Sequence, residues 1–159
     1  MTRTLAVVVA LLLMAVPMFA QQPKESVHLV ITGGANAGTY DATTDRGGCS
    51  AGLTGKGSFG NQFSLPKEKD PKKFNSLQLI VPDAKAAAGG THTFYVSVGF
   101  GPLINRSAEY KVDTAKNSGS GTVTVADKGA TATVTIDATT AAGVKLHATI
   151  DCKSVMRAQ

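Results

Sequence analysis

Residues 121–152 read GTVTVADKGATATVTIDATTAAGVKLHATIDC and carry the clearest pattern in the chain. Apolar and polar residues alternate along three runs within them, Gly121–Ala126, Ala130–Ala138 and Val144–Cys152. A period of two residues is typical of a β-strand with one buried face and one face in water. The stretch therefore predicts three strands whose Val, Ile, Leu and Ala side chains face a core and whose Thr side chains face outward.

The first two of these strands are expected to form a hairpin. A two-residue loop, Lys128-Gly129, places Val125 opposite Ala132, so that apolar residues pair on one face of the sheet. Both residues of such a loop need a positive φ angle, which a lysine adopts poorly. A four-residue loop that keeps the same faces together is the alternative.

The N-terminal residues have the pattern of a secretory signal peptide. Arg3 precedes an apolar run from Leu5 to Ala20, and polar residues follow. The run is shorter than the roughly 20 apolar residues of a membrane span, so we expect no membrane span after cleavage. The chain is divided into a signal peptide (1–20), a polar leader (21–25), one β domain (26–153) and a C-terminal tail (154–159).

Both cysteines, Cys49 and Cys152, lie in the part of the chain that would be exported. Each alternates with core residues and is expected to face inward. Exported proteins fold in oxidising surroundings, so we predict a Cys49–Cys152 disulfide. The absence of a Cys-x-x-Cys spacing argues against a redox-active pair.

Turn signals divide the rest of the chain into further short strands. They are expected at residues 26–32, 39–43, 49–53, 61–65, 76–81, 91–99 and 107–113. Asp83 is placed to cap one short helical turn near residues 84–88, which Gly89 and Gly90 would end. The sequence thus predicts an all-β chain: a single-domain antiparallel β-sandwich of about eight or nine short strands, with a small closed β-barrel as the alternative.

The sequence shows no assembled catalytic or metal-binding group. No serine or thiol has a recognisable histidine partner, and no two carboxylates are recognisable as a facing pair. The three histidines, His28, His92 and His147, occupy polar or edge positions of strands and are far apart in sequence. We therefore expect surface histidines, no zinc site, no cofactor and no enzymatic activity.

Positive charge is concentrated in one loop. The formal net charge is +5, and removal of residues 1–20, which contain only Arg3, leaves +4. The segment Lys67–Lys73 has four lysines and two acids around a proline. Mixed charges of this kind are typical of a solvated loop, and we predict no nucleic-acid binding.

These observations favour a secreted or cell-envelope domain, periplasmic or extracellular, that acts as an interaction or structural module. Its partner is expected to be a protein or a glycan. Loops carry most binding groups on rigid β scaffolds, and the candidate binding residues are Gly34, Asn36, Phe59, Asn61, Lys67 and Lys72. The alternative is a small-ligand or carbohydrate carrier with a pocket inside a β-barrel. A filled core favours the module, and an internal pocket of several hundred Å³ favours the carrier.

Overall fold

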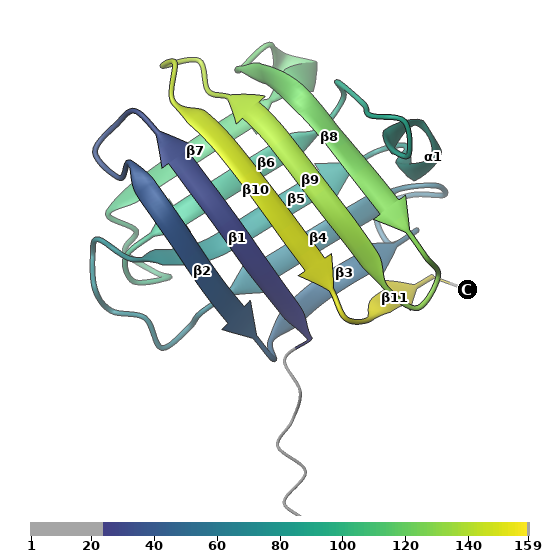
Figure 1. Cartoon of the computed structure of the whole chain (residues 1–159), viewed down its shortest axis with the longest axis horizontal. Helices are drawn as coiled ribbons and strands as arrows, with labels where there is room; N and C mark the ends of the chain where they lie inside the picture. Colours follow the sequence, from purple (N-terminus) through teal and green to yellow (C-terminus); the bar gives the residue numbers. More distant parts are fainter. Residues whose placement is uncertain (1–23, 159) are drawn as a thin grey trace, which may run out of the picture.

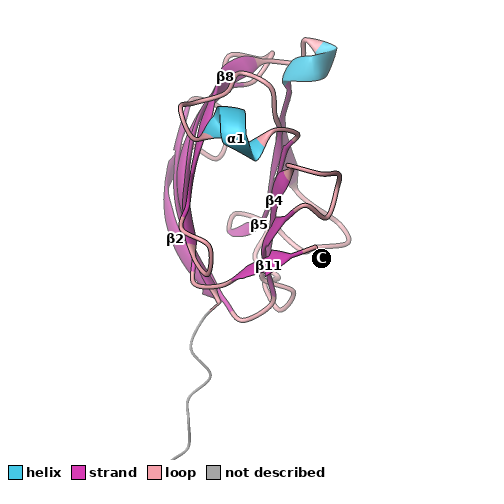
Figure 2. Ribbon diagram, turned by 90° about the vertical axis from the view of Figure 1, so that its right-hand side faces the viewer, coloured by secondary structure: helices cyan, strands magenta, loops and turns pink. Residues whose placement is uncertain are grey.

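The computed structural model describes residues 24–158 and places its strands in two sheets that lie face to face. In Figure 1 the strands of the front sheet cross those of the rear sheet, and Figure 2 shows the two layers edge on. The sheets remain open and do not close into a barrel. The predicted all-β sandwich is therefore confirmed, and the closed-barrel alternative is wrong. The expected signal peptide, residues 1–20, lies outside the described residues.

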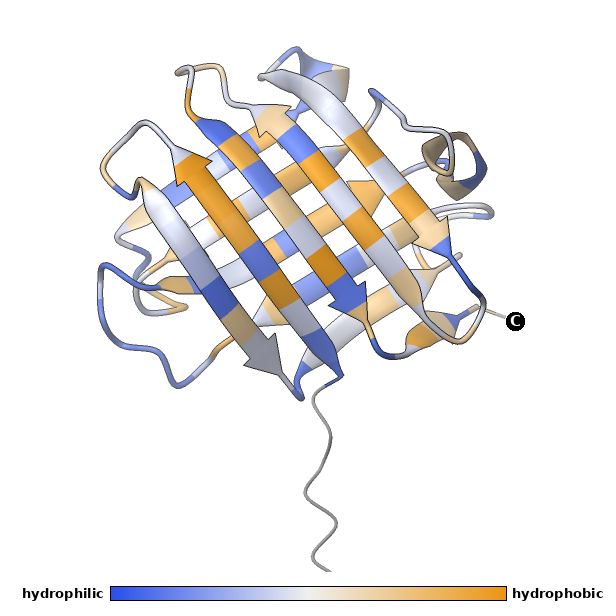
Figure 3. Cartoon of the chain, in the orientation of Figure 1, coloured by the Kyte–Doolittle hydropathy of each residue, from blue (hydrophilic) through white to orange (hydrophobic). Residues whose placement is uncertain are grey.

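The front sheet has five strands, and all neighbouring strands are antiparallel. In sheet order they are β2 (Gly38–Thr44), β1 (Glu25–Thr32), β10 (Lys145–Cys152), β9 (Ala132–Thr139) and β8 (Ser120–Asp127). Figure 3 shows hydrophobic and polar bands alternating along β1, β8, β9 and β10. Because inward positions bury mostly Val, Ile, Leu or Ala and outward positions carry mostly polar residues, these strands cover one side of the core.

The rear sheet has six strands. In sheet order they are β11 (Val155–Arg157), β3 (Gly47–Ala51), β4 (Phe59–Ser64), β5 (Phe74–Val81), β6 (Tyr95–Phe100) and β7 (Ala108–Asp113). Only β11 runs parallel to its neighbour, which is β3. The described part contains eleven strands, which is one more than the ten segments predicted from the sequence and more than the total of about eight or nine expected for the sandwich. One reason is that β11 lies in the segment expected to be a tail, where Val155 packs against the core.

The predicted helical turn is present as α1 (Ala84–Ala87), at the edge of the sandwich near β8 (Figure 2). The Asp83 side chain accepts hydrogen bonds from the backbone N–H groups of Lys85 and Ala86, which is the expected N-cap. A 3-10 helix, Thr114–Lys116, was not predicted. It ends at Asn117, whose φ of 52° lies in the left-handed region that asparagine tolerates better than most residues.

The β8–β9 hairpin differs from the favoured register. Val125 lies opposite Val134, and Asp127 lies opposite Ala132, so the two-residue loop is wrong and the four-residue loop is present. Gly129 has a positive φ of 84°, whereas Lys128 does not have a positive φ. The longer loop therefore spares Lys128 the backbone conformation that a two-residue turn would impose. Both registers keep the same side chains on the buried face.

Aromatic rings fill the space between the sheets. Phe63 and Phe74 stack with ring centroids 5.3 Å apart, and Phe100 meets Phe74 edge-on at 6.2 Å. Tyr40 and Tyr110 each approach Phe100 edge-on from the front and rear sheets, at 5.1 and 5.9 Å. Such tilted and offset contacts stabilise aromatic cores. The interior is thus packed with side chains.

The predicted disulfide joins the two sheets. Cys49 of β3 and Cys152 of β10 are bonded, with Cα atoms 5.8 Å apart and 103 positions apart in sequence. The adjoining β11 is held by Arg157, whose guanidinium donates to the Asp127 carboxylate at 2.5 Å and to the carbonyl of Gly129. The C-terminal residues therefore connect the rear sheet to the β8–β9 loop of the front sheet.

Candidate functional site

The six candidate binding residues do not form one site. Phe59 and Asn61 are 0% and 4% exposed and belong to the core side of β4, so the folded protein keeps both from a ligand. Alternation along β4 turns them inward; the sequence interpretation had placed them beside a loose loop. Lys67 and Lys72 are exposed in the β4–β5 loop.

Gly34 and Asn36 lie in the β1–β2 turn, where two tyrosines fix the backbone. The Tyr110 hydroxyl donates to the Asn36 side-chain oxygen at 3.0 Å, and the Tyr40 hydroxyl donates to the Asn36 carbonyl at 2.9 Å. The polar groups of Asn36 are therefore largely used within the protein. This turn is therefore held by one tyrosine from each sheet, on the edge strands β2 and β7.

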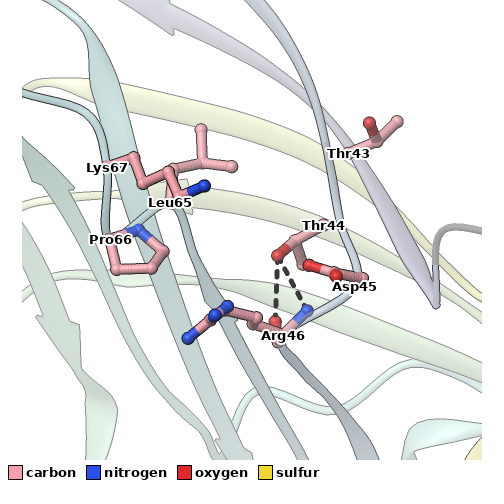
Figure 4. A pocket seen from close by; sticks show the side chains of 7 residues that line it. All are labelled: Thr43, Thr44, Asp45, Arg46, Leu65, Pro66 and Lys67. Atoms are coloured by element: carbon pink, nitrogen blue, oxygen red, sulfur yellow. Dashed lines mark hydrogen bonds between the residues drawn. The ribbon is translucent and has the colours of Figure 1, made fainter.

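A surface hollow lies between the β2–β3 turn and the start of the β4–β5 loop. It is a hollow of about 460 Å³ lined by Thr43, Thr44, Asp45, Arg46, Leu65, Pro66 and Lys67 (Figure 4). We call it the basic groove. Figure 4 shows the Arg46 side chain extending from the turn toward Pro66, and Lys67 following Pro66 on the opposite wall. Of the six candidates, only Lys67 lines the groove.

Thr44 builds the wall that carries Arg46. Its hydroxyl accepts a hydrogen bond from the Arg46 backbone N–H at 3.0 Å and lies 3.0 Å from the Ser64 carbonyl oxygen. Thr44 is 6% exposed, so a buried hydroxyl ties the β2–β3 turn to the end of β4. The sequence prediction missed Arg46, although a short turn with one cation between two strands was visible as Asp45-Arg46-Gly47-Gly48.

The acids of the β4–β5 loop bind the loop's own backbone. The Glu68 carboxylate accepts from the N–H groups of Lys69 and Asp70, each at 2.9 Å. Asp70 in turn accepts from the Lys72 N–H at 2.9 Å. Within residues 24–158, no ion pair involves Arg46 or any lysine of this loop. The loop therefore presents cations that its own acids leave unpaired.

A second hollow of about 460 Å³ lies beside the basic groove and shares Leu65 with it. Strand β2 forms one wall through residues 39–42, and the other wall consists of Glu68 and Lys73 of the β4–β5 loop with Phe74 of β5. Among residues 24–158, β2 is the last strand of its sheet, and no further strand of this part of the chain covers that side of the sandwich. The two hollows follow the same edge.

A buried polar cluster lies next to the disulfide. Glu25, expected in the polar leader, is instead the first residue of β1, and it is 0% exposed. Its Oε1 accepts a hydrogen bond from Asn61 Nδ2 at 2.5 Å, and the same amide lies 3.4 Å from Cys49 Sγ. Burial raises the pKa of the Glu25 carboxyl from 4.5 to about 7, and the hydrogen bond from Asn61 opposes part of that rise.

The buried cluster favours the protonated form of the Glu25 carboxyl. Glu25 Oε2 and Asn61 Oδ1 have no hydrogen-bond partner within the described protein. Both are acceptors when the carboxylate is ionised, whereas a proton on Oε2 makes it a donor. Complete burial keeps the carboxyl from any substrate, so its effect is on stability.

The sequence contains one match to the Gly-x-Ser-x-Gly motif of serine hydrolases, Gly48-Cys49-Ser50-Ala51-Gly52, which the prediction overlooked. That motif needs a sharp turn from a strand into a helix. Ser50 lies instead within β3, paired with β4 and β11, and no histidine of the described chain contacts it. The match therefore does not form a nucleophile elbow.

All three histidines are exposed, as predicted. His28 lies 2.7 Å from Asp41, His147 lies 2.5 Å from Asp137, and His92 contacts the carbonyl of Gly121 at 2.7 Å. Within residues 24–158, no three His, Cys, Asp or Glu side chains come together in a way that could hold a metal ion. The histidine pairs are cross-strand contacts on the outer face of the front sheet.

No family model matches the chain, and no curated protein or solved structure matches it either. Among the helices of residues 24–158, none has the length and apolar character needed to cross a bilayer. The disulfide fits a protein that folds in an extracellular or periplasmic compartment.

Proposed function

We propose that the protein is an exported, non-enzymatic interaction module that binds an acidic glycan in the basic groove. The observation that carries this proposal is the pair of cations, Arg46 and Lys67, that line one open groove without an ion-pair partner among the described residues. Export rests on the N-terminal apolar run and the disulfide.

The packed interior supports an interaction module over a carrier. The largest side chains between the sheets, including Phe59, Phe63 and Phe100, are almost completely buried, and the hollows lie at the surface. A carrier instead needs a cavity that encloses most of its ligand. Because the core is filled with side chains, we expect a ligand to bind at the surface of the sandwich.

The chemistry of the groove suits a sugar acid. A guanidinium pairs well with a carboxylate through two parallel N–H donors, which assigns Arg46 to the charged group. Leu65 and Pro66 provide an apolar wall on which the C–H face of a sugar ring can pack. The hydroxyl of Thr43 adds a neutral hydrogen-bonding group.

Titration calorimetry with hexagalacturonate tests the proposal. We expect the mature protein to bind at low salt and more weakly as salt rises. The variant Arg46→Gln/Lys67→Gln should bind at least tenfold more weakly, because each cation contributes about 1 kcal/mol or more. The charge-matched control Lys128→Gln/Lys145→Gln changes two exposed lysines away from the groove and should bind within twofold of the unaltered protein.

Two results would contradict the proposal: no binding of hexagalacturonate at low salt, or an equal loss in both double variants. The second result would indicate attraction by net charge alone. A DNA duplex of equal charge serves as a further probe, and tighter binding of DNA than of the uronate would overturn the assignment to a glycan.

A further inference from the structure

The outer face of the rear sheet contains a further hollow, separate from the two at the β2 edge and different in character. It has a volume of about 310 Å³ and lies over β3, β4 and β5 with Met156 of β11 at its side. Gly48 and Gly60 form part of its lining, and we call it the glycine hollow. None of its lining residues carries a charge, in contrast to the basic groove.

Gly60 is unusual among the strand glycines. Its φ is not positive, and a Cβ atom there would make ordinary contacts of 3.4 Å to Ser50 Oγ and 3.5 Å to the Leu79 carbonyl oxygen. By comparison, a Cβ at Gly47 would lie 1.9 Å from the Gln62 carbonyl oxygen, and one at Gly99 would lie 2.5 Å from Ser76 Oγ. Neither backbone conformation nor packing requires a glycine at position 60.

A glycine inside a strand weakens the sheet and often marks a place where a ligand comes close to the backbone. Gly60 lies between Ser50 of β3 and Ile80 of β5 in the strand register. The missing side chain therefore leaves a depression in the middle of the sheet.

The walls of the glycine hollow combine apolar and amide groups. Leu53 and Met156 are 54% and 63% exposed, which is unusual for large apolar side chains that lie in the same hollow. Gln62 and Gln78 are directly opposite each other on β4 and β5, and both are exposed. Each amide both donates and accepts hydrogen bonds, as neighbouring sugar hydroxyls require.

From these features we infer that the glycine hollow is a binding site for an uncharged sugar unit of a glycan. Its apolar walls pack against the C–H face of a pyranose ring, and the two glutamine amides bind the hydroxyl groups. The uncharged lining offers no ion pair to a charged ligand.

The position of the hollow disfavours an extended peptide. A peptide that joins a sheet gains its affinity from main-chain hydrogen bonds at a free edge. At the hollow, β3 lies between β11 and β4, and β4 lies between β3 and β5. Their backbone groups are already used within the sheet, so binding there depends on side chains.

The site is tested with the mature protein and four neutral hexasaccharides: cellohexaose, laminarihexaose, maltohexaose and hexa-N-acetylchitohexaose. Calorimetry and amide chemical shifts report binding, and we expect at least one hexasaccharide to shift Ser50, Gly60, Gln62 and Gln78. Gly60→Thr places a side chain in the hollow and should weaken binding at least tenfold. Its melting temperature should stay equal or rise, because threonine favours strands more than glycine does.

Thr124→Val, on the outer face of the front sheet, is the matched control and should leave binding unchanged. Gln62→Ala/Gln78→Ala should weaken binding of the neutral hexasaccharides in the same way. If Gly60→Thr fails to fold, this double variant alone tests the site. Arg46→Gln/Lys67→Gln should keep its affinity for neutral hexasaccharides, which separates this site from the basic groove.

Three outcomes would overturn the inference. They are no shift with any of the four neutral hexasaccharides, unchanged binding in Gly60→Thr or in the double glutamine variant, and tighter binding of an uncharged, acetylated Ser/Thr pentapeptide than of any sugar.

Discussion

The two sheets of the sandwich differ in how completely their buried groups are satisfied. The front sheet has regular strands of seven or eight residues and buries mostly apolar side chains. Among residues 24–158, Glu25 of β1 is its one buried side chain with an atom that has no hydrogen-bond partner. The rear sheet and its loops bury Ser58, Asn61, Asn75 and Ser76, each with a side-chain atom that has no hydrogen-bond partner within the described protein. The rear sheet also carries the glycine hollow and one wall of the basic groove.

This difference indicates a division of roles. A sheet in which pattern, packing and polar satisfaction agree specifies the fold, and departures from those rules concentrate where a protein binds something. We therefore propose that most of the front sheet is the scaffold, and that the rear sheet, together with the edge at β2, is the surface that meets partners. The following predictions test that division.

The largest effect is expected from the bond that joins the two sheets. Replacing both cysteines, Cys49→Ala/Cys152→Ala, removes a cross-link between positions 103 apart. The free energy of unfolding should fall by about 4 kcal/mol, because the unfolded chain regains the freedom that the loop had restricted. Urea unfolding of the variant and the unaltered protein measures this. A loss below about 1 kcal/mol would mean that the sheets associate without help from the cross-link.

The second effect concerns Glu25, the one carboxyl among residues 24–158 that is buried between the sheets. Because the pKa of Glu25 is raised to about 7 in the folded state, the fold keeps a proton that the unfolded chain releases above pH 4.5. Stability should therefore fall as pH rises from about 4.5 to 7 and level off above 7, by at most about 3 kcal/mol. Urea unfolding across this range measures the slope.

Glu25→Gln is the matched variant, since it keeps the shape and has no proton to release. It should flatten the pH dependence and be more stable than the unaltered protein at pH 8. The same slope in both proteins would show that another group causes it.

A smaller effect distinguishes the two hairpin registers of the front sheet. Gly129→Ala should lower the free energy of unfolding by about 1 kcal/mol, because alanine is strained at a φ of 84°. Lys128→Gly should give no gain, since Lys128 does not have a positive φ in the four-residue loop. Stabilisation by Lys128→Gly would instead support the two-residue loop. Thermal and urea unfolding of both variants measure these changes.

The difference between the two sheets also explains which features could be predicted from the sequence. In the front sheet, strict alternation located the strands and the inward position of Cys152, because the buried face of β9 and β10 is apolar throughout. The hairpin register was missed by two residues, since that shift keeps every side chain on the same face. From the sequence alone, only the positive φ that a two-residue loop requires of Lys128 could distinguish the two registers.

The rear sheet was harder to predict because its features depend on contacts between distant residues. Glu25 and Asn61 are 36 positions apart and meet only across the two sheets, so neither appears buried in sequence. Strand β11 has three residues and needs β3 as a neighbour. The basic groove joins a turn and a loop about 20 positions apart, and only Lys67 stood out through the local excess of lysine.

The most direct test of the division is amide chemical-shift mapping of the mature protein with hexagalacturonate. We predict that the shifted residues are confined to positions 43–46 and 65–73, on the edge shared by β2 and the β4–β5 loop. The outward Thr residues of β8, β9 and β10 should stay unchanged. Shifts centred on that threonine face, or no shifts at all, would contradict the assignment of binding to the basic groove.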